Sequence, residues 1–132
     1  MTDADPGAVL RRSKTIAVVG LSSNSARPSY GVAHYLQGQG YRIIPVNPNE
    51  TEVLGERAYP SVGAIPERVD LVDVFRASDA APEVARDAVR AGAKALWLQL
   101  GIRSDEARRI AQEAGLDYVE DQCAKIAHAL TD

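Results

Sequence analysis

Short apolar runs alternate with longer amphipathic stretches along the chain, and this alternation is its main structural signal. The apolar runs are rich in β-branched residues. They lack the strict alternation of apolar and polar residues that is typical of a strand with one solvent-exposed face. Such runs are typical of parallel strands that helices cover on both faces. We therefore expect strands at residues 15–20, 41–46, 70–75, 94–100 and 116–120.

Between these runs, apolar residues recur at the spacing of a helix. Val84 and Ala88 lie one turn apart on one face of such a stretch, and Gly92 follows it as a stop signal. The same kind of pattern predicts helices at residues 29–39, 82–91, 104–114 and 122–130, and a shorter helix within the first 14 residues.

Strands that alternate with helices predict an α/β fold: a Rossmann-like, doubly wound, five-stranded parallel sheet in a single domain spanning residues 1–132. Two strand orders, 3-2-1-4-5 and 2-1-3-4-5, fit this pattern. Pro45 is awkward in a central strand, so we expect a strand end or a bulge there. The segment 47–66 is the longest irregular stretch, with one short helix capped by Ser61 expected in it.

The composition narrows the class of protein. The chain has 132 residues, of which 45% are hydrophobic and 25% charged, as in an ordinary globular domain. This length has no room for a nucleotide-binding module and a separate catalytic domain. The net charge of −3 does not suggest sequence-independent nucleic-acid binding, which draws on a strongly basic face.

One cysteine excludes an intrachain disulfide and a cysteine-based zinc site. The first residues lack the basic and apolar regions of a signal peptide, and no apolar run approaches the ~20 residues of a membrane span. We expect a soluble, cytoplasmic protein with no membrane partner. His34 and His128 have no partner at ligand spacing, so we assign no metal and, with no local catalytic motif, no catalytic residue.

In open α/β sheets ligands bind beyond the carboxyl ends of the strands, so the residues after each strand are the candidates. The first strand is followed by Gly20, Leu21 and Ser22, and Arg27 stands just before the next helix. A glycine, small hydroxyl residues and a helix N-terminus suit a phosphate loop, although an ordinary strand-to-helix turn fits equally well. Arg27 is the best candidate for a phosphate partner.

The residues after the second strand argue against a nicotinamide dinucleotide. That cofactor favours Asp or Glu at this point, because a carboxylate accepts from both ribose hydroxyls, whereas Val46 is followed by Asn47 and Pro48. Pro48 would form a rigid wall beside a ring or a sugar. Arg76 and Arg103 follow the third and fourth strands, and we interpret them as surface charges.

Three further polar residues stand near this end of the sheet. Asp73 and Gln99 interrupt apolar strands, and each needs hydrogen-bond partners if it is buried. For Asp73 we expect neighbouring backbone groups to be those partners, whereas Gln99 is a candidate for orienting the loops of a site. Cys123, at the start of the last predicted helix, is either a reactive thiol or a quiet, partly buried cysteine.

Taken together, these residues resemble the CoA-binding domain family, in its small stand-alone branch. They are similar to the N-terminal CoA-binding domain of the succinyl-CoA synthetase α subunit. The similarity extends from about Lys14 to His128, and its specificity comes from an ordered set of segments: 17–22, 27–32, 40–48, 53–56, 59–61, 69–76 and 96–102.

The resemblance implies a coenzyme A site across the strand ends, built from twelve residues. They are Gly20, Leu21, Ser22 and Arg27 at the phosphates; Val46, Asn47 and Pro48 at the adenosine half; Val74, Phe75 and Arg76 beside the pantetheine or the nucleotide; and Gln99 and Cys123 near the thiol.

The chain departs from the synthetase α subunit in its plainer glycine loop and in the lack of the second domain that holds a phosphorylated histidine. We therefore expect non-catalytic binding of coenzyme A or an acyl-CoA, as a carrier, a sensor or a partner of a larger enzyme. Two alternatives stay open: a small NAD(P)-linked or CoA-dependent enzyme assembled as a homo-oligomer, and a CoA-thiol redox protein that uses Cys123.

Overall fold

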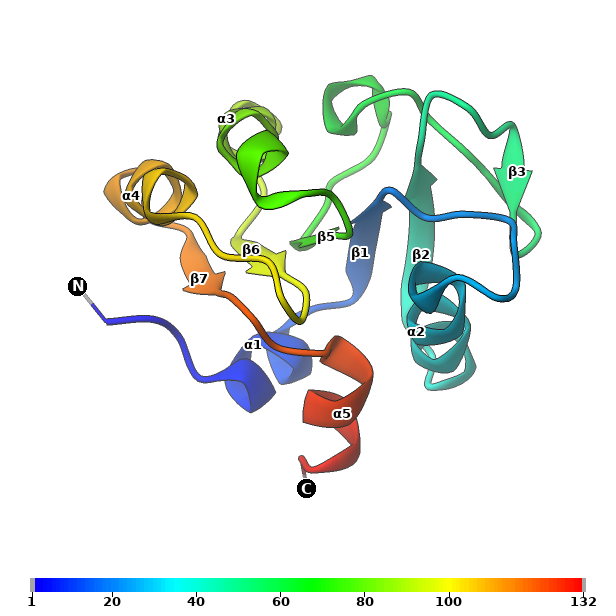
Figure 1. Cartoon of the computed structure of the whole chain (residues 1–132), viewed down its shortest axis with the longest axis horizontal. Coiled ribbons are helices and arrows are strands. Elements are labelled where there is room, and N and C mark those ends of the chain that lie inside the picture. Colours follow the sequence, from blue (N-terminus) through cyan, green and yellow to red (C-terminus); the bar gives the residue numbers. More distant parts are fainter. Residues whose placement is uncertain (1, 132) are drawn as a thin grey trace.

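The computed structural model describes residues 2–131 and contains a five-stranded parallel sheet with helices on both faces (Figure 1). The sheet order is β2-β1-β5-β6-β7, which is the second of the two predicted orders. The predicted Rossmann-like α/β fold is thereby confirmed. The strands are β1 (Thr15–Val19), β2 (Arg42–Val46), β5 (Leu71–Val74), β6 (Ala95–Leu98) and β7 (Asp117–Val119).

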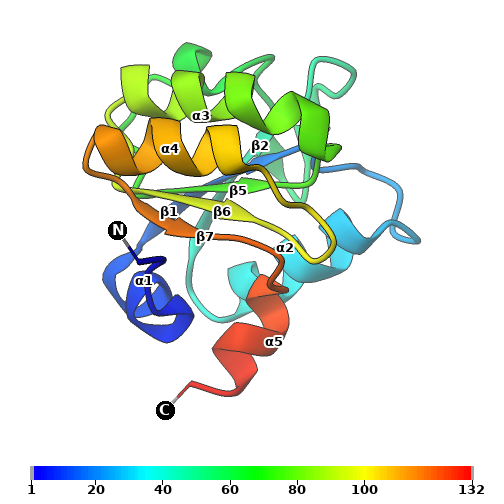
Figure 2. The ribbon, with the colours of Figure 1, turned by 60° about the vertical axis from the view of Figure 1, so that its left-hand side comes forward.

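The helices form a layer on each face of the sheet (Figure 2). One layer holds α1 (Pro6–Arg12), α2 (Pro28–Gly38) and α5 (Ala124–Ala129), and the other holds α3 (Ala81–Arg90) and α4 (Asp105–Glu113). Each predicted helix is present, with its ends displaced by one or two residues. Within residues 2–131, none of the helices combines the length and the apolar character needed to cross a lipid bilayer.

Local signals explain where several helices begin. Asp5 caps α1 by accepting a hydrogen bond from the backbone of Ala8 at 3.0 Å, and Ser104 caps α4 in the same way from Ala107. α2 begins at Pro28, whose fixed φ and missing N–H suit a first helical position. Its N-cap residue, Arg27, makes no side-chain capping bond, so this guanidinium is available for other contacts.

Alternate residues of each strand face opposite layers, which divides the core in two. One half packs under α3 and α4, and the other lies under α1, α2 and α5. Trp97 of β6 is fully buried in the second half, and its indole N–H donates to the carbonyl of Gln122 at 2.8 Å. That bond fixes the segment leading into α5.

The segment after β2 is more ordered than its sequence suggests. It contains an unpredicted two-stranded antiparallel pair, β3 (Glu52–Val53) and β4 (Glu56–Arg57), and then a 3-10 turn, η1 (Val62–Ala64). Ser61 precedes η1 as predicted, but its side chain makes no capping bond there. A second 3-10 turn, η2 (Ser78–Ala80), leads directly into α3.

Pro45 lies within β2 and marks neither a strand end nor a bulge. It pairs with Val18, and the residues before and after it pair with β1 in the same register. β2 is an edge strand, and the Pro45 carbonyl accepts from Tyr59 on the outer side. In a strand the nitrogen of a residue faces the same side as its carbonyl, so the missing N–H removes no bond from the ladder with β1.

Candidate functional site

The strand order creates a crevice between the carboxyl ends of β1 and β5. The chain leaves β1 through α2 on one face of the sheet and leaves β5 through α3 on the other, so the two connections diverge. Ligands of doubly wound folds bind at such a point. Here the loop that begins at Gly20 meets the turn formed by Phe75 and Arg76.

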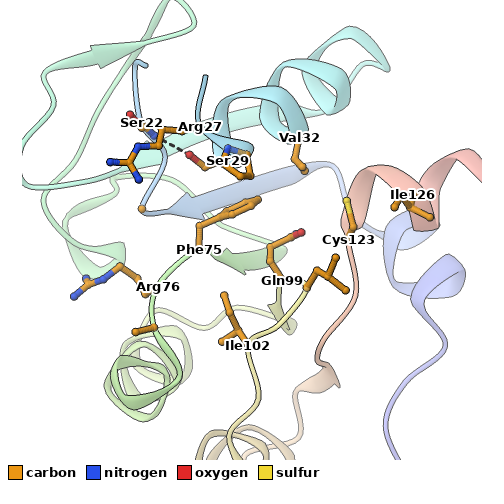
Figure 3. A pocket seen from close by; sticks show the side chains of 14 residues that line it. Ser22, Arg27, Ser29, Val32, Phe75, Arg76, Gln99, Ile102, Cys123 and Ile126 are labelled. Carbon is orange, nitrogen blue, oxygen red and sulfur yellow. Dashed lines mark hydrogen bonds between the residues drawn. The ribbon is translucent and has the colours of Figure 1, made fainter. Parts of the chain in front are cut away.

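A cavity of about 550 Å³ opens at this point, between α2 and the start of α5. Its volume is in the range of small-molecule sites. Figure 3 shows that its two ends differ in chemistry: the side chains of Arg27 and Arg76 lie at one end, whereas Val32, Cys123 and Ile126 lie at the other. The ring of Phe75 lies between these ends.

A second cavity, of about 360 Å³, adjoins the first across the ends of β1 and β2. The two cavities share Gly20, Phe75 and Arg76. Val46, Asn47 and Pro48 line the second cavity and not the first. A ligand with two unlike parts joined by a charged linker would therefore fit with its linker beside Arg76.

Gly20 is the point of closest approach between the two loops. Its φ of +89° is one that residues with a side chain rarely adopt, and an added Cβ would lie 2.5 Å from the Phe75 carbonyl oxygen. The Phe75 N–H donates to the Val19 carbonyl at 2.8 Å. The absence of a side chain at position 20 thus allows the turn after β5 to pack against the loop after β1.

The backbone of the loop after β1 is largely satisfied by the protein itself. The N–H of Ser22 donates to the Ser29 hydroxyl at 3.1 Å, and that of Ser23 donates to the Glu50 carboxylate at 2.8 Å. Asn24 and Ala26 donate to side chains within the loop. This loop therefore presents fewer backbone donors to an anion than its composition suggests, and the charge of Arg27 becomes correspondingly more important.

The arginines at this edge divide into two kinds. Within residues 2–131, neither Arg27 nor Arg76 forms an ion pair. Arg103 instead contacts Asp121 at 2.5 Å. The hydrogen bond from the Gly101 N–H, and then the one from Arg103, hold the pKa of Asp121 below its ordinary value. Arg103 is thus a paired surface charge, whereas Arg27 and Arg76 have no carboxylate competing with an anionic ligand.

Asn47 connects the two loops that border the second cavity. Its side-chain nitrogen donates to the Leu21 carbonyl at 3.1 Å, and its side-chain oxygen accepts from the backbone of Asn49 at 2.9 Å. A carboxylate could not make the first of these bonds because it has no donor. The amide at this position therefore has a clear structural role, besides its place in the cavity wall.

Asp73 and Gln99 form a buried pair next to the apolar end of the first cavity. The Gln99 side-chain nitrogen donates to one Asp73 oxygen at 2.5 Å, and the Gln99 oxygen accepts from the backbone of Ala124 at 3.3 Å. The partner of Asp73 is therefore a side chain and not the neighbouring backbone, so the prediction for this residue is wrong. The backbone groups beside Asp73 are used in the sheet ladder, and the Gln99 side chain supplies the hydrogen bond instead.

The other oxygen of Asp73 has no hydrogen-bond partner and is fully buried. Burial raises the pKa of this carboxyl to about 7, although the bond from Gln99 acts in the opposite direction. An unpartnered buried carboxyl oxygen is uncommon in folded proteins, and here it lies directly behind a residue of the cavity wall.

Cys123 is half-buried and is the N-cap residue of α5. Its sulfur faces the cavity beside Val32 and Ile126 (Figure 3). Among residues 2–131, no three His, Cys, Asp or Glu side chains are arranged to hold a metal ion.

The structure places ten of the twelve predicted site residues on the two cavities. The first cavity is lined by Gly20, Ser22, Arg27, Phe75, Arg76, Gln99 and Cys123, and the second adds Val46, Asn47 and Pro48. Leu21 and Val74 are fully buried in the core and line neither cavity. These two residues position the loops, and their side chains are unavailable to a ligand.

The apolar lining was missed at the sequence level. It includes Val32, one turn into α2, and Leu100, Ile102 and Ile126. Leu100 and Ile126 are 68% and 56% exposed, which is unusual for large apolar side chains in a small domain. The continuous apolar run predicts a strand over residues 94–100, whereas β6 ends at Leu98, so Leu100 lies beyond the sheet.

Comparison with known proteins connects this geometry to a family. The family described as "CoA binding domain" matches residues 14–129. An uncharacterised protein of Bacillus subtilis strain 168, YneT, is 43% identical over 123 residues, which are 93% of this chain and 91% of that protein. A hypothetical protein from Pyrococcus horikoshii OT3 has a structure that superposes with a TM-score of 0.92 at 40% identity, covering 98% of this chain and 91% of that one.

A much larger relative shares only this domain. The ADP-forming acetate–CoA ligase II of Archaeoglobus fulgidus (strain ATCC 49558) is 32% identical over 83 residues, which are 61% of this chain and 12% of the ligase. The chain is thus similar to one module of a long enzyme and, over nearly its full length, to small proteins.

Proposed function

The chain belongs to the CoA-binding domain family, and from that premise we propose that it binds coenzyme A or an acyl-CoA across the ends of β1, β5 and β6 without transforming it. The observation that carries the proposal is the position of Arg27 and Arg76. Both are free of ion pairs within residues 2–131, and they lie where an apolar cavity meets a second cavity.

The phosphates of coenzyme A suit this junction. The ligand carries a pyrophosphate between its adenosine and pantetheine halves and a further phosphate on its ribose. Guanidinium groups make strong, often bidentate contacts with phosphate oxygens. Arg76 borders both cavities and Arg27 borders the first, so the two side chains flank the place that the pyrophosphate would occupy.

The two cavities suit the two halves of the ligand. Pro48 and Asn47 provide a rigid wall and polar groups for the adenosine half. The apolar lining of Val32, Ile102 and Ile126 suits the pantetheine arm, which ends at Gln99 and Cys123. No carboxylate occupies the position where nicotinamide dinucleotide sites hold the ribose, which favours coenzyme A over NAD.

We propose that the chain acts as a carrier of coenzyme A, as a sensor of it, or as a partner of a larger enzyme. The similarity to 12% of an ADP-forming acetate–CoA ligase supports such a role, because it connects this fold to a protein that uses coenzyme A.

Calorimetric titration of the full chain with coenzyme A, dephospho-CoA and NAD tests the proposal. We expect saturable one-to-one binding of coenzyme A and weaker binding of NAD. Weaker binding of dephospho-CoA would add that the ribose phosphate is recognised. Tighter binding of NAD than of coenzyme A, or no binding of coenzyme A, would refute the proposal.

A second candidate function rests on Cys123, whose sulfur faces the same cavity. In a thiol–disulfide exchange its thiolate would attack CoA disulfide. A bond forms between the Cys123 sulfur and one CoA sulfur, the disulfide of the reagent breaks, and the other CoA leaves as a thiolate that takes up the proton. Intact-mass measurement would detect the adduct. Faster modification by CoA disulfide than by oxidised glutathione supports this function, and equal rates contradict it.

A further inference from the structure

The hydrogen bonds around Gln99 determine which of its groups faces a ligand. The backbone N–H of Ala124 is a donor, so the group of Gln99 that meets it is the amide oxygen, at 3.3 Å. The amide nitrogen therefore points to Asp73, which accepts one of its two N–H groups at 2.5 Å. The opposite orientation of the amide would place two donors against each other, so this network fixes the orientation.

One N–H of Gln99 has no acceptor in this network. The side chain is 3% exposed and lines the first cavity next to Cys123 (Figure 3). The amide oxygen and the first N–H are already used by Ala124 and Asp73. The second N–H is thus the donor that Gln99 has left within residues 2–131, and any partner for it must be an acceptor.

The position of this donor narrows the choice of acceptor. Arg27 and Arg76 lie at the opposite end of the cavity, whereas the apolar side chains of Val32 and Ile126 lie at the end near Gln99. A ligand whose phosphates lie at the arginines would bring its far end to Gln99. A free thiol is a weak acceptor, whereas the carbonyl oxygen of a thioester is a good one.

We propose that Gln99 donates its remaining amide N–H to the thioester carbonyl of an acyl-CoA, and that Asp73 is the positioning residue that holds Gln99 in this orientation. The inference rests on the proposed function and extends it, because it names acyl-CoA, and not free coenzyme A, as the preferred ligand. It also accounts for the buried Asp73 carboxyl, whose second oxygen has no partner. The apolar side chains at this end of the cavity suit the hydrocarbon part of an acyl group.

Acetyl-CoA and S-ethyl-CoA form a matched pair of probes, since they differ only by the carbonyl oxygen at the carbon attached to sulfur. We expect the unaltered chain to bind acetyl-CoA about three- to tenfold more tightly than S-ethyl-CoA, the range of one neutral hydrogen bond. In Gln99→Met, which has a similar shape and no donor, the two affinities should become equal.

Substitutions of Asp73 separate positioning from folding. Asp73→Asn keeps an oxygen that accepts from Gln99, so the preference for acetyl-CoA should survive. Asp73→Leu removes the acceptor, so the preference should fall. Because the leucine variant also leaves a buried amide N–H unpaired, its unfolding temperature is measured alongside to establish that it is folded at the temperature of the titration. Loss of the preference in a stably folded variant would then reflect the orientation of Gln99.

The outcomes also separate this inference from the proposed function. If coenzyme A and both probes bind but acetyl-CoA has no advantage over S-ethyl-CoA, the inference is overturned and coenzyme A binding stands. A preference that persists in Gln99→Met overturns it too, because the carbonyl contact would then lie elsewhere. If no CoA compound binds, the proposed function fails together with the inference.

Discussion

The backbone of Gly20 runs so close to Phe75 that a Cβ at position 20 would lie 2.5 Å from the Phe75 carbonyl oxygen. This contact joins the ends of the two strands at which the chain changes direction across the sheet. It also fixes the Phe75–Arg76 turn, which borders both cavities. The site and the switch in strand order therefore depend on the same glycine.

Gly20→Ala should lower the free energy of unfolding by about 2 kcal/mol or more, because the added carbon meets rigid backbone and the φ is unfavourable for alanine. Denaturant titration measures this. Gly31→Ala is the matched control. Gly31 lies within α2 with open space around its Cα, so alanine there should stabilise the protein by about 0.5–1 kcal/mol. A neutral Gly20→Ala would contradict the close contact.

Arg27→Ala and Arg76→Ala should each weaken coenzyme A binding by about 1.5–3 kcal/mol, the value of a hydrogen bond to a charged group. Calorimetry on each variant gives the change directly. Arg109→Ala serves as a control, since Arg109 is an exposed residue of α4 that lines neither cavity. If all three variants bind coenzyme A with equal affinity, its phosphates do not lie at Arg27 and Arg76.

Asp73→Asn should change how stability depends on pH. Burial raises the pKa of Asp73 from 3.8 to about 7, so between these values the folded chain keeps a proton that the unfolded chain releases. Stability therefore falls as the pH rises from about 4 to 7, by on the order of 4 kcal/mol from this group. Asparagine cannot ionise, so the variant should gain stability relative to the unaltered chain over that range.

Denaturant titrations of both proteins between pH 4 and 8 measure this difference. Asp70 provides the contrast, because the N–H groups of Lys14 and Thr15 outweigh the effect of burial and lower its pKa. The ionised Asp70 carboxylate stabilises the folded chain at neutral pH. This contribution is lost as the pH falls through the pKa that Asp70 has in the folded chain. A difference between Asp73→Asn and the unaltered chain that does not vary with pH would show that Asp73 is already ionised at low pH.

Asn47→Ala should destabilise the chain by about 1 kcal/mol and weaken binding of the adenosine half. The substitution removes the bond to the Leu21 carbonyl and the bond from Asn49, which hold two loops together. Measuring the affinity for AMP alongside that for coenzyme A isolates this half of the ligand. If both affinities are unchanged, the second cavity is not the adenosine site.

Much of the fold could be predicted because the strands are mostly apolar and glycines follow α2, α3 and α4 as stop signals. The unpredicted pair β3–β4 has no such pattern. Each of its strands is only two residues long, and charged residues such as Glu52 and Arg57 stand beside the apolar Val53. The choice between two strand orders also needed the structure. It depends on whether β5 pairs with β1 or with β2, and this long-range pairing leaves no trace in the local periodicity of the sequence.

The site was predicted in outline because strand ends in this fold class converge, which brought Gly20, Asn47, Phe75 and Gln99 together. Two kinds of detail were out of reach. The partner of Asp73 depends on side-chain direction across neighbouring strands. The apolar end of the cavity depends on how α2 and α5 lie relative to each other, so Ile126 gave no signal of its own.

The central claim, that coenzyme A occupies this cavity, is tested most directly by nuclear magnetic resonance of the ¹⁵N-labelled full chain during titration with coenzyme A. The account predicts saturable shifts of backbone amides at Gly20–Ser29, at Phe75–Ala77 and at Gln99 and Cys123, while amides at the opposite end of the sheet, around Lys14 and Tyr41, stay in place. No shifts at a saturating concentration, or shifts centred on Lys14 and Tyr41, would contradict it.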